Sequence, residues 1–251
     1  MSKFVIRTLD GKADNRLTSL WLASFPNDPI DYVEGFLAHL PQDTVTMVGE
    51  CNGEPATMLF LLPAKARFRG ELYPVRYLYA GCTHPDYRGR GYYRELMSAA
   101  AVKVAELNEN AIYLHPADDM LTATYQRLGY KVGIGSCQSQ KDTEWQSVFS
   151  SVDEYVHLRR HLIKQLSQKS VFWDANEQTT RFIIADAVSR NAQMFRDNKG
   201  VALMHNNKII ESLSLAEQKS NDAFCLWLPI SSSPLTDLMN EFGGSTGLVG
   251  D

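Results

Sequence analysis

Residues 77–107 read YLYAGCTHPDYRGRGYYRELMSAAAVKVAEL and predict a buried strand, a tight basic turn and an amphipathic helix. The strand, residues 75–83, is rich in aromatic and β-branched side chains, which suit a sheet. Pro85 ends it, because proline cannot donate a hydrogen bond to a strand ladder. Beyond the turn, apolar residues recur at the three- and four-residue spacing of a helix with one buried face. These residues are Leu96, Ala100, Val104 and Leu107.

The turn carries the sequence Arg88-Gly89-Arg90-Gly91. A strand that leads through a glycine-bearing turn into a helix leaves backbone N–H groups without helical partners at the positive end of the helix dipole. Such an arrangement binds phosphate, and glycine lets the backbone approach the anion closely. Three arginines, Arg88, Arg90 and Arg94, add charge and forked donors. The turn therefore predicts a phosphate or pyrophosphate site; a solvated basic turn and part of a nucleic-acid surface are the alternatives.

Two segments resemble motifs of the GNAT N-acetyltransferase family. Residues 83–93 resemble motif A, Gln/Arg-x-x-Gly-x-Gly/Ala, with Arg88 and Gly91 at the first and fourth positions. Tyr93 departs from the pattern, because the sixth position is small in the family. Residues 114–130 are similar to motif B, a helix that ends in Tyr-x-x-x-Gly-Phe/Tyr. The large residue at position 93 makes the chain resemble the Eis-type branch (enhanced intracellular survival) most.

The fold class that follows is α/β (α+β with a mixed sheet): the GNAT fold, a central mixed sheet flanked by helices. The order of elements agrees, since three antiparallel strands followed by strand, helix, strand and helix form a mixed sheet. The strands are expected at 4–8, 44–50, 56–68, 75–83 and 111–114, and the helices at 14–25, 30–40, from 92 onward and from about 120.

Two domains are expected, a GNAT acetyltransferase domain over 1–140 and a smaller α/β unit over 141–251. The second unit is expected to contain helices at 152–166, 176–190 and 235–242, and short strands between residues 192 and 229. One interpretation is a degenerate GNAT-like half, which would wall the acceptor site or form a homo-oligomer contact.

The resemblance implies acetyl-CoA as co-substrate. In the family, the strand at 111–114 runs parallel to the central strand and splays away from it, which admits the pantetheine arm. The resemblance assigns Gly81, Cys82 and Thr83 to pantetheine and thioester contacts. It assigns the pyrophosphate to the turn and the helix start, together with Arg88. The turn and helix-start residues are Gly89, Arg90, Gly91, Tyr92, Tyr93 and Arg94.

Tyr125 is the general acid by resemblance, protonating the departing CoA thiolate. The alternative is a core tyrosine, and for Cys82 the alternative is a small buried hydrophobe. His115, His84, Glu34 and an ordered water are alternatives for the base. In the Eis-type branch the C-terminal carboxylate enters the active site, which adds Asp251.

The predicted helices at 14–25 and 30–40 also bear on the acceptor. In the family they form part of its pocket, which makes Phe25, Tyr32 and Phe36 candidates to line it; a core role is the alternative.

The composition of the chain limits the kinds of partner that it is expected to bind. The chain has 251 residues, 44% hydrophobic and 22% charged, with a net charge of −4, which argues against a general nucleic-acid binder. Its four cysteines show no metal-binding or pairing pattern, so we expect reduced thiols in the cytoplasm and no metal. The N-terminal residues MSKFVIRTLDGK lack a long apolar run, so no signal peptide is expected. No stretch approaches the length of a membrane span, so no membrane partner is expected.

These expectations describe an N-acetyltransferase that moves an acetyl group from acetyl-CoA to a primary amine by direct attack in a ternary complex. Two alternatives remain: a non-catalytic module that binds or senses acyl-CoA, and an interaction scaffold.

Overall fold

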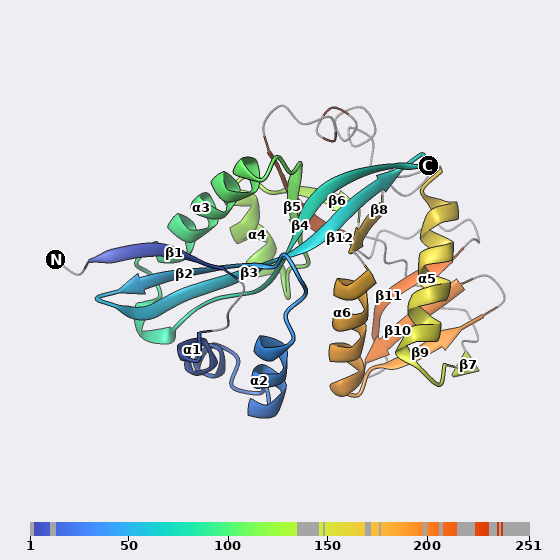
Figure 1. Cartoon of the computed structure of the whole chain (residues 1–251), viewed down its shortest axis with the longest axis horizontal. Coiled ribbons are helices and arrows are strands. Elements are labelled where there is room, and N and C mark those ends of the chain that lie inside the picture. Colours follow the sequence, from blue (N-terminus) through green and yellow to red (C-terminus); the bar gives the residue numbers. More distant parts are fainter. Residues whose placement is uncertain are drawn as a thin grey trace.

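The computed structural model contains two β-sheets with helices packed on them (Figure 1). It describes residues 3–10, 14–134, 146–147, 149–168, 172–175, 177–197, 200–205, 208–214, 224–230, 235 and 237.

The first sheet has eight strands in the order β1-β2-β3-β4-β5-β12-β6, with β8 paired to β3 beyond the end of β2. The strands are β1 (Phe4–Asp10), β2 (Val45–Cys51), β3 (Glu54–Phe68), β4 (Glu71–Thr83), β5 (Ala111–Leu114), β6 (Lys131–Ile134), β8 (Phe172–Ala175) and β12 (Phe224–Pro229). Strands β4 and β5 run parallel, and the other described pairs are antiparallel. The expected mixed sheet flanked by helices is confirmed.

Strand β3 shows why helices cover both faces of this sheet. Successive side chains of a strand point to opposite faces, and residues 56–62 are all buried. Leu59 and Leu61 pack under α3 (Tyr92–Glu106), whereas Phe60 and Leu62 pack under α1 (Arg16–Ser24) and α2 (Ile30–Ala38). In Figure 1, α3 lies above the sheet and α1 and α2 lie below it. A short helix η1 (Pro85–Tyr87) precedes α3, and α4 (Asp119–Arg127) follows β5.

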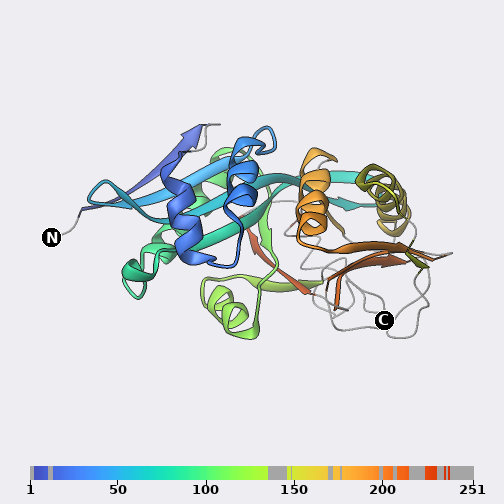
Figure 2. The same cartoon turned by 90° about the horizontal axis from the view of Figure 1, so that it is seen from below.

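The second sheet has four strands in the order β11-β10-β9-β7. They are β7 (Gln146–Ser147), β9 (Gln193–Arg196), β10 (Gly200–His205) and β11 (Lys208–Ser214). Helices α5 (Val152–Leu166) and α6 (Glu177–Ser189) lie over it (Figure 2). Tyr155, Ile163, Ile184 and Val201 form the centre of this smaller core.

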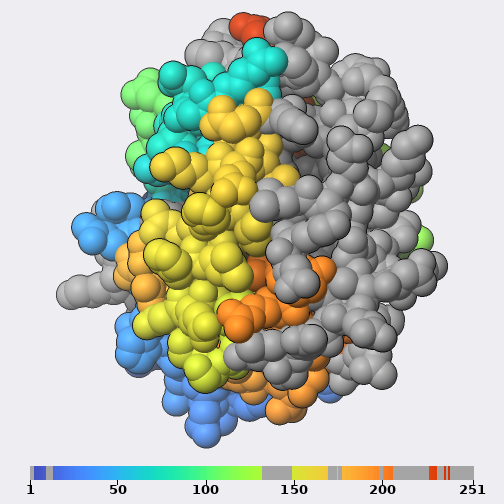
Figure 3. All heavy atoms as spheres, turned by 90° about the vertical axis from the view of Figure 1, so that its right-hand side faces the viewer, coloured from blue at the N-terminus to red at the C-terminus, as the bar shows by residue number. Residues whose placement is uncertain are grey.

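Residues beyond position 140 contribute to both sheets. Strand β12 lies between β5 and β6, and β8 continues the edge of β3. The Arg69 N–H, in the β3–β4 turn, donates to the Ser167 carbonyl at 2.6 Å. Figure 3 shows α5, in yellow, on the surface beside that hairpin. Of the predicted helix at 235–242, only Leu235 and Asp237 are described, and both are helical.

The ends of the predicted elements shift by a few residues. Strand β4 starts at Glu71 rather than at residue 75, because the turn at Arg69 and Gly70 brings Phe68 opposite Glu71. Both turn residues have positive φ, at 47° and 88°.

Candidate active site

Strands β4 and β5 separate soon after they meet. Their parallel pairing covers only Arg76 with Ile112 and Tyr77 with Tyr113. Beyond Tyr77 the strands diverge, so the edge of β4 formed by residues 78–83 faces a cavity rather than β5. The predicted splay is therefore present at the predicted place.

A β-bulge reshapes β4 at this edge. Tyr79 lies opposite Phe60 and Cys82 lies opposite Met58, so Ala80 and Gly81 together oppose the single residue between them on β3. Ala80 has a φ of 47°, a left-handed conformation that costs free energy in a residue with a side chain. Bulges recur beside active sites, where they re-aim the backbone. A glycine inside a strand often marks a bulge. Gly81 was therefore a sign of this bulge in the sequence, although no bulge was predicted there.

The turn after β4 has the geometry expected of an anion site. Gly89 and Gly91 have φ values of 76° and 82°, in the region that glycine tolerates best. Gly91 is the N-cap of α3 and has no side chain that could accept from the first-turn N–H groups. These N–H groups lack intrahelical acceptors and lie at the positive end of the helix dipole.

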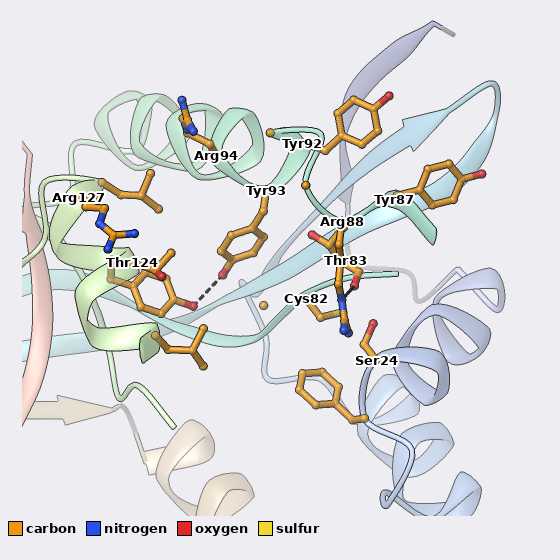
Figure 4. A pocket seen from close by; sticks show the side chains of 17 residues that line it. Ser24, Cys82, Thr83, Tyr87, Arg88, Tyr92, Tyr93, Arg94, Thr124 and Arg127 are labelled. Carbon is orange, nitrogen blue, oxygen red and sulfur yellow. Dashed lines mark hydrogen bonds between the residues drawn. The ribbon is translucent and has the colours of Figure 1, made fainter. Parts of the chain in front are cut away.

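A cavity of about 720 Å³ lies between this turn, the edge of β4 and α4 (Figure 4). Every residue predicted for the donor site lines it except Arg90. The predicted lining residues are Gly81, Cys82, Thr83, Arg88, Gly89, Gly91, Tyr92, Tyr93, Arg94 and Tyr125. The cavity is also lined by Phe25, a predicted acceptor-pocket candidate. Further lining residues, for which no role was predicted, include Ser24, Tyr87, Leu121, Thr124 and Arg127.

The two arginines of the turn point in different directions. Arg88 Nε donates to the Thr83 carbonyl at 3.1 Å, and Figure 4 shows its side chain extending into the cavity. Arg90 donates to the Asp86 carbonyl at 2.9 Å, and its guanidinium lies over the Tyr87 ring, 5.3 Å from the centroid. The hypothesis that both arginines face one ligand thus fits Arg88 but not Arg90. Arg127, from α4, supplies a third cavity arginine beside Arg88 and Arg94.

Two tyrosine hydroxyl groups meet in this cavity. Tyr93 is on the first turn of α3 and Tyr125 is near the end of α4, and their oxygens are 2.9 Å apart (Figure 4). Burial raises the pKa of both phenols, and their hydrogen bond lowers the pKa of Tyr125 and raises that of Tyr93. Tyr125 therefore holds its proton at neutral pH.

Gly81 is required by the approach of Tyr93. A Cβ atom at position 81 would lie 2.2 Å from the Tyr93 hydroxyl oxygen and 3.1 Å from Leu78 Cδ2. The large residue at position 93 and the missing side chain at position 81 are thus complementary.

The Cys82 side chain is buried. It packs in the core beneath α1 and α2, and burial raises the pKa of its thiol to about 12. The thiolate is therefore not populated at neutral pH, and the interpretation as a small buried hydrophobe describes the side chain. Thr57 Oγ1 donates to the Cys82 carbonyl at 2.7 Å and holds this end of β4 in place.

A second cavity, of about 260 Å³, meets the first at Phe25, Gly81, Leu121 and Tyr125, which line both. Its other walls come from the α1–α2 region, β4, the loop after β5 and the residue after α6. They are Trp21, Asp28, Tyr77, Leu78, Tyr79, Ala80, Leu114, His115, Pro116, Ala117 and Arg190. Of the aromatic candidates on the first two helices, Phe25 lines this cavity, whereas Phe36 is core.

The candidates for the base separate in space. His115 lines the second cavity, with its ring edge-on to Tyr77 at 5.8 Å between centroids. Glu34 is exposed on α2, and His84 lies at the start of η1 near Asp86; neither is among the described residues lining the two cavities. Asp251 lies outside the described residues.

Arg190, the residue that follows α6, lines the second cavity and contacts residues of both α6 and the α1–α2 region. Its NH1 is 2.9 Å from Asp28 Oδ1 and its Nε is 3.0 Å from Asp186 Oδ1. Tyr79 donates to the other oxygen of Asp186 at 2.6 Å, and the guanidinium lies over the Tyr32 ring, 4.0 Å from the centroid.

Arg190→Ala should lower the free energy of unfolding by about 1–3 kcal/mol, because two partly buried carboxylates lose their cation. Thermal unfolding measures this loss. Arg190→Lys is the control: it keeps the charge without the two-sided fork and should be intermediate. An unfolding free energy of Arg190→Ala equal to that of the parent would contradict a stabilising role of these ion pairs.

The described part of the chain shows neither a metal-binding cluster nor a membrane-spanning helix. Its histidine, cysteine, aspartate and glutamate side chains form no group of three or more that could hold a metal ion. None of the helices described combines the length and apolarity needed to span a membrane.

Comparison with known proteins identifies the first half of the chain. The family model for the acetyltransferase (GNAT) domain matches residues 5–133, just over half of the chain. No curated protein sequence matches the chain significantly.

Solved structures share the fold over most of the chain. A probable N-acyltransferase from Enterococcus faecalis V583 has a TM-score of 0.59 at 14% identity, over 85% of this chain and 59% of its own. A GCN5-related N-acetyltransferase from Kribbella flavida has a TM-score of 0.57 at 14% identity, over 94% and 66%. Eis1 from Mycobacterium abscessus has a TM-score of 0.56 at 12% identity, over 92% and 67%. At these identities the likeness shows the fold alone, and the chain spans less than two thirds of the first two proteins.

Proposed function

The chain belongs to the GNAT acetyltransferase family, and from this membership we propose that it transfers an acetyl group from acetyl-CoA to a primary amine by direct attack in a ternary complex. The observation that carries the proposal is the junction of the two cavities at Gly81 and Tyr125. A donor in the larger cavity and an acceptor in the smaller one would meet at this junction. Holding two reactants in such an arrangement removes much of the entropic barrier to their reaction.

In this proposal the larger cavity holds acetyl-CoA. The pantetheine arm pairs with the open edge of β4, as an added strand would. The pyrophosphate lies on the N–H groups at the start of α3, with Arg88 and Arg94 beside it. Arg127 adds a cation on the α4 side of the cavity.

The chemical step uses few protein groups. The neutral amine nitrogen attacks the thioester carbonyl, so a C–N bond forms and negative charge develops on the oxygen. Backbone N–H groups along the open edge of β4 are available to stabilise that charge. The C–S bond then breaks, Tyr125 gives its proton to the sulfur, and the nitrogen loses its extra proton. His115, in the acceptor cavity, is the group we propose to take that proton, directly or through a water molecule.

The proposed cellular location of the enzyme rests on the state of its cysteines. Cys51 and Cys82 are both free and buried, which supports the proposal of a reducing cytoplasm. Self-association through the smaller unit stays a prediction.

A second candidate is a module that binds acyl-CoA without turnover. Tyr93 favours it, because its hydroxyl group reaches Gly81 and Tyr125 in the donor cavity. Free thiol release from acetyl-CoA in the presence of amines separates the two: the enzyme releases thiol, and the binding module does not.

Acetyl-CoA should raise the apparent melting temperature in a saturable way. A ligand of the folded state at 100 times its Kd stabilises by about 2.7 kcal/mol, which is about 5–10 °C for a chain of this size. No rise with acetyl-CoA or with CoA would contradict both candidates.

The same titration tests the arginine geometry. Arg88→Ala should weaken acetyl-CoA binding by about 10-fold or more, because a charge-assisted phosphate contact is lost. Arg90→Ala is the matched control and should leave the Kd within about twofold, because Arg90 faces Asp86 and Tyr87. Equal weakening by both substitutions would overturn the assignment of Arg88 as the turn's phosphate ligand.

A further inference from the structure

We propose that the acceptor is a compact primary monoamine with an aromatic body, which binds in the smaller cavity with its amine at the Gly81–Tyr125 junction. The inference rests on the proposed function and adds the substrate class. Three features of the cavity carry it: aromatic walls, a carboxylate that is already neutralised, and a small volume.

The walls of the cavity away from the junction are aromatic. Tyr77 and Tyr79 lie 5.9 Å apart between ring centroids, and Trp21 lies 6.5 Å from Tyr79. Phe25 closes the near side, 5.8 Å from Trp21. These spacings show that the rings pack on one another and form a continuous aromatic wall. A planar apolar group that lies against this wall gains both burial and ring contacts.

The one described carboxylate of the cavity wall already has its hydrogen-bond and ion-pair partners within the protein. Among the described lining residues, Asp28 is the sole carboxylate. Its two oxygens accept from Trp21 Nε1 at 2.7 Å and from Arg190 NH1 at 2.9 Å. Arg190 brings a positive charge to the same wall, so a polycation would face a cation rather than a row of free carboxylates.

The volume of the smaller cavity limits the size of the amine that it can hold. A cavity of about 150 Å³ is enough for benzene, so about 260 Å³ has room for one ring with a short aminoalkyl arm. A multi-ring amino sugar would leave most of its body outside. Because Gly81 and Tyr125 also line the donor cavity, the arm directs its nitrogen to the thioester while the ring stays among Trp21, Tyr77 and Tyr79.

The test compares four amines with the full chain and acetyl-CoA, with thiol release as the readout: 2-phenylethylamine, ethylamine, spermidine and kanamycin. We expect kcat/KM for 2-phenylethylamine to exceed that for ethylamine on the order of 100-fold, because the ring is buried. Spermidine and kanamycin should be poorer than 2-phenylethylamine.

A pair of variants at position 77 ties the preference to the cavity. Tyr77 lines the acceptor cavity and is absent from the described lining of the donor cavity. Tyr77→Leu should lower kcat/KM for 2-phenylethylamine about tenfold and for ethylamine less than threefold. Tyr77→Phe keeps the ring and should keep the ratio of kcat/KM for 2-phenylethylamine to that for ethylamine, which Tyr77→Leu should lower. The acetyl-CoA thermal shift reports that both variants are folded.

The possible failures are distinguishable. Efficient use of spermidine or kanamycin with little use of 2-phenylethylamine would overturn the inference and leave the acetyltransferase activity standing. An equal kcat/KM for 2-phenylethylamine and ethylamine, or an equal effect of Tyr77→Leu on both, would also overturn it. No thiol release with any of the four amines, despite an acetyl-CoA thermal shift, would overturn this inference and favour the binding module.

Discussion

Replacing Tyr125 by phenylalanine is expected to lower kcat by about 100-fold or more while the Kd of acetyl-CoA changes by less than about twofold. The substitution removes one hydroxyl group and keeps the ring that packs against Tyr93 and Tyr130. If Tyr125 is the acid, the CoA thiolate must then leave unprotonated or take its proton from water. Steady-state thiol release and an acetyl-CoA thermal-shift titration measure the two quantities.

The pKa of Tyr125 sets the pH range of this effect. Burial raises it above its ordinary value, and the hydrogen bond with Tyr93 opposes that rise only in part. A group with a raised pKa stays protonated at and below its ordinary value, so the acid is present throughout the neutral range. The loss in kcat should accordingly be the same at pH 7 and pH 9.

Tyr130→Phe is the matched control. The Tyr130 hydroxyl is buried and has no hydrogen-bond partner among the described residues, and its ring lies 5.5 Å from that of Tyr125 between centroids. Removing an unpaired buried hydroxyl should leave kcat unchanged and cost no stability. A Tyr125→Phe enzyme with parental kcat, or an equal loss from both substitutions, would refute the role of Tyr125 as the acid.

Gly81→Ala is expected to lower kcat/KM by about 100-fold and the free energy of unfolding by about 1–3 kcal/mol. The added methyl group would lie 2.2 Å from the Tyr93 oxygen, so one of the two must move. Tyr93 is hydrogen-bonded to Tyr125, and its displacement would carry the acid with it. A shift of about 1 Å in a reacting group is enough for such a loss.

A second substitution tests the cause of this loss. Tyr93→Phe removes the atom that the new methyl group meets, so the double variant Gly81→Ala/Tyr93→Phe should be more stable and more active than Gly81→Ala alone. The single variant Tyr93→Phe supplies the baseline for the cycle. If the double variant shows only the sum of the two single losses, the contact between positions 81 and 93 is not what makes glycine necessary.

Much of the fold could be predicted because its signals are local. The apolar spacing after Gly91 sets which face of α3 is buried, and Gly89 and Gly91 set a turn that few other residues tolerate. Asp118 is the N-cap of α4, and its side chain accepts from the Leu121 N–H at 2.7 Å. These features depend on residues within one or two turns of each other, so the order of residues is enough to indicate them.

The residues alone were thus enough to predict the strand, the turn and the helix beside the larger cavity, together with the family to which the chain belongs. Which distant side chains meet depends on the folded arrangement. It turned Arg90 away from the cavity, joined Tyr93 to Tyr125 across 32 positions, and brought Arg190 to Asp28 across 162. It also inserted β12 between β5 and β6. The physical reason is that such contacts depend on how whole elements pack, and no short-range periodicity or turn preference records where a distant side chain will end.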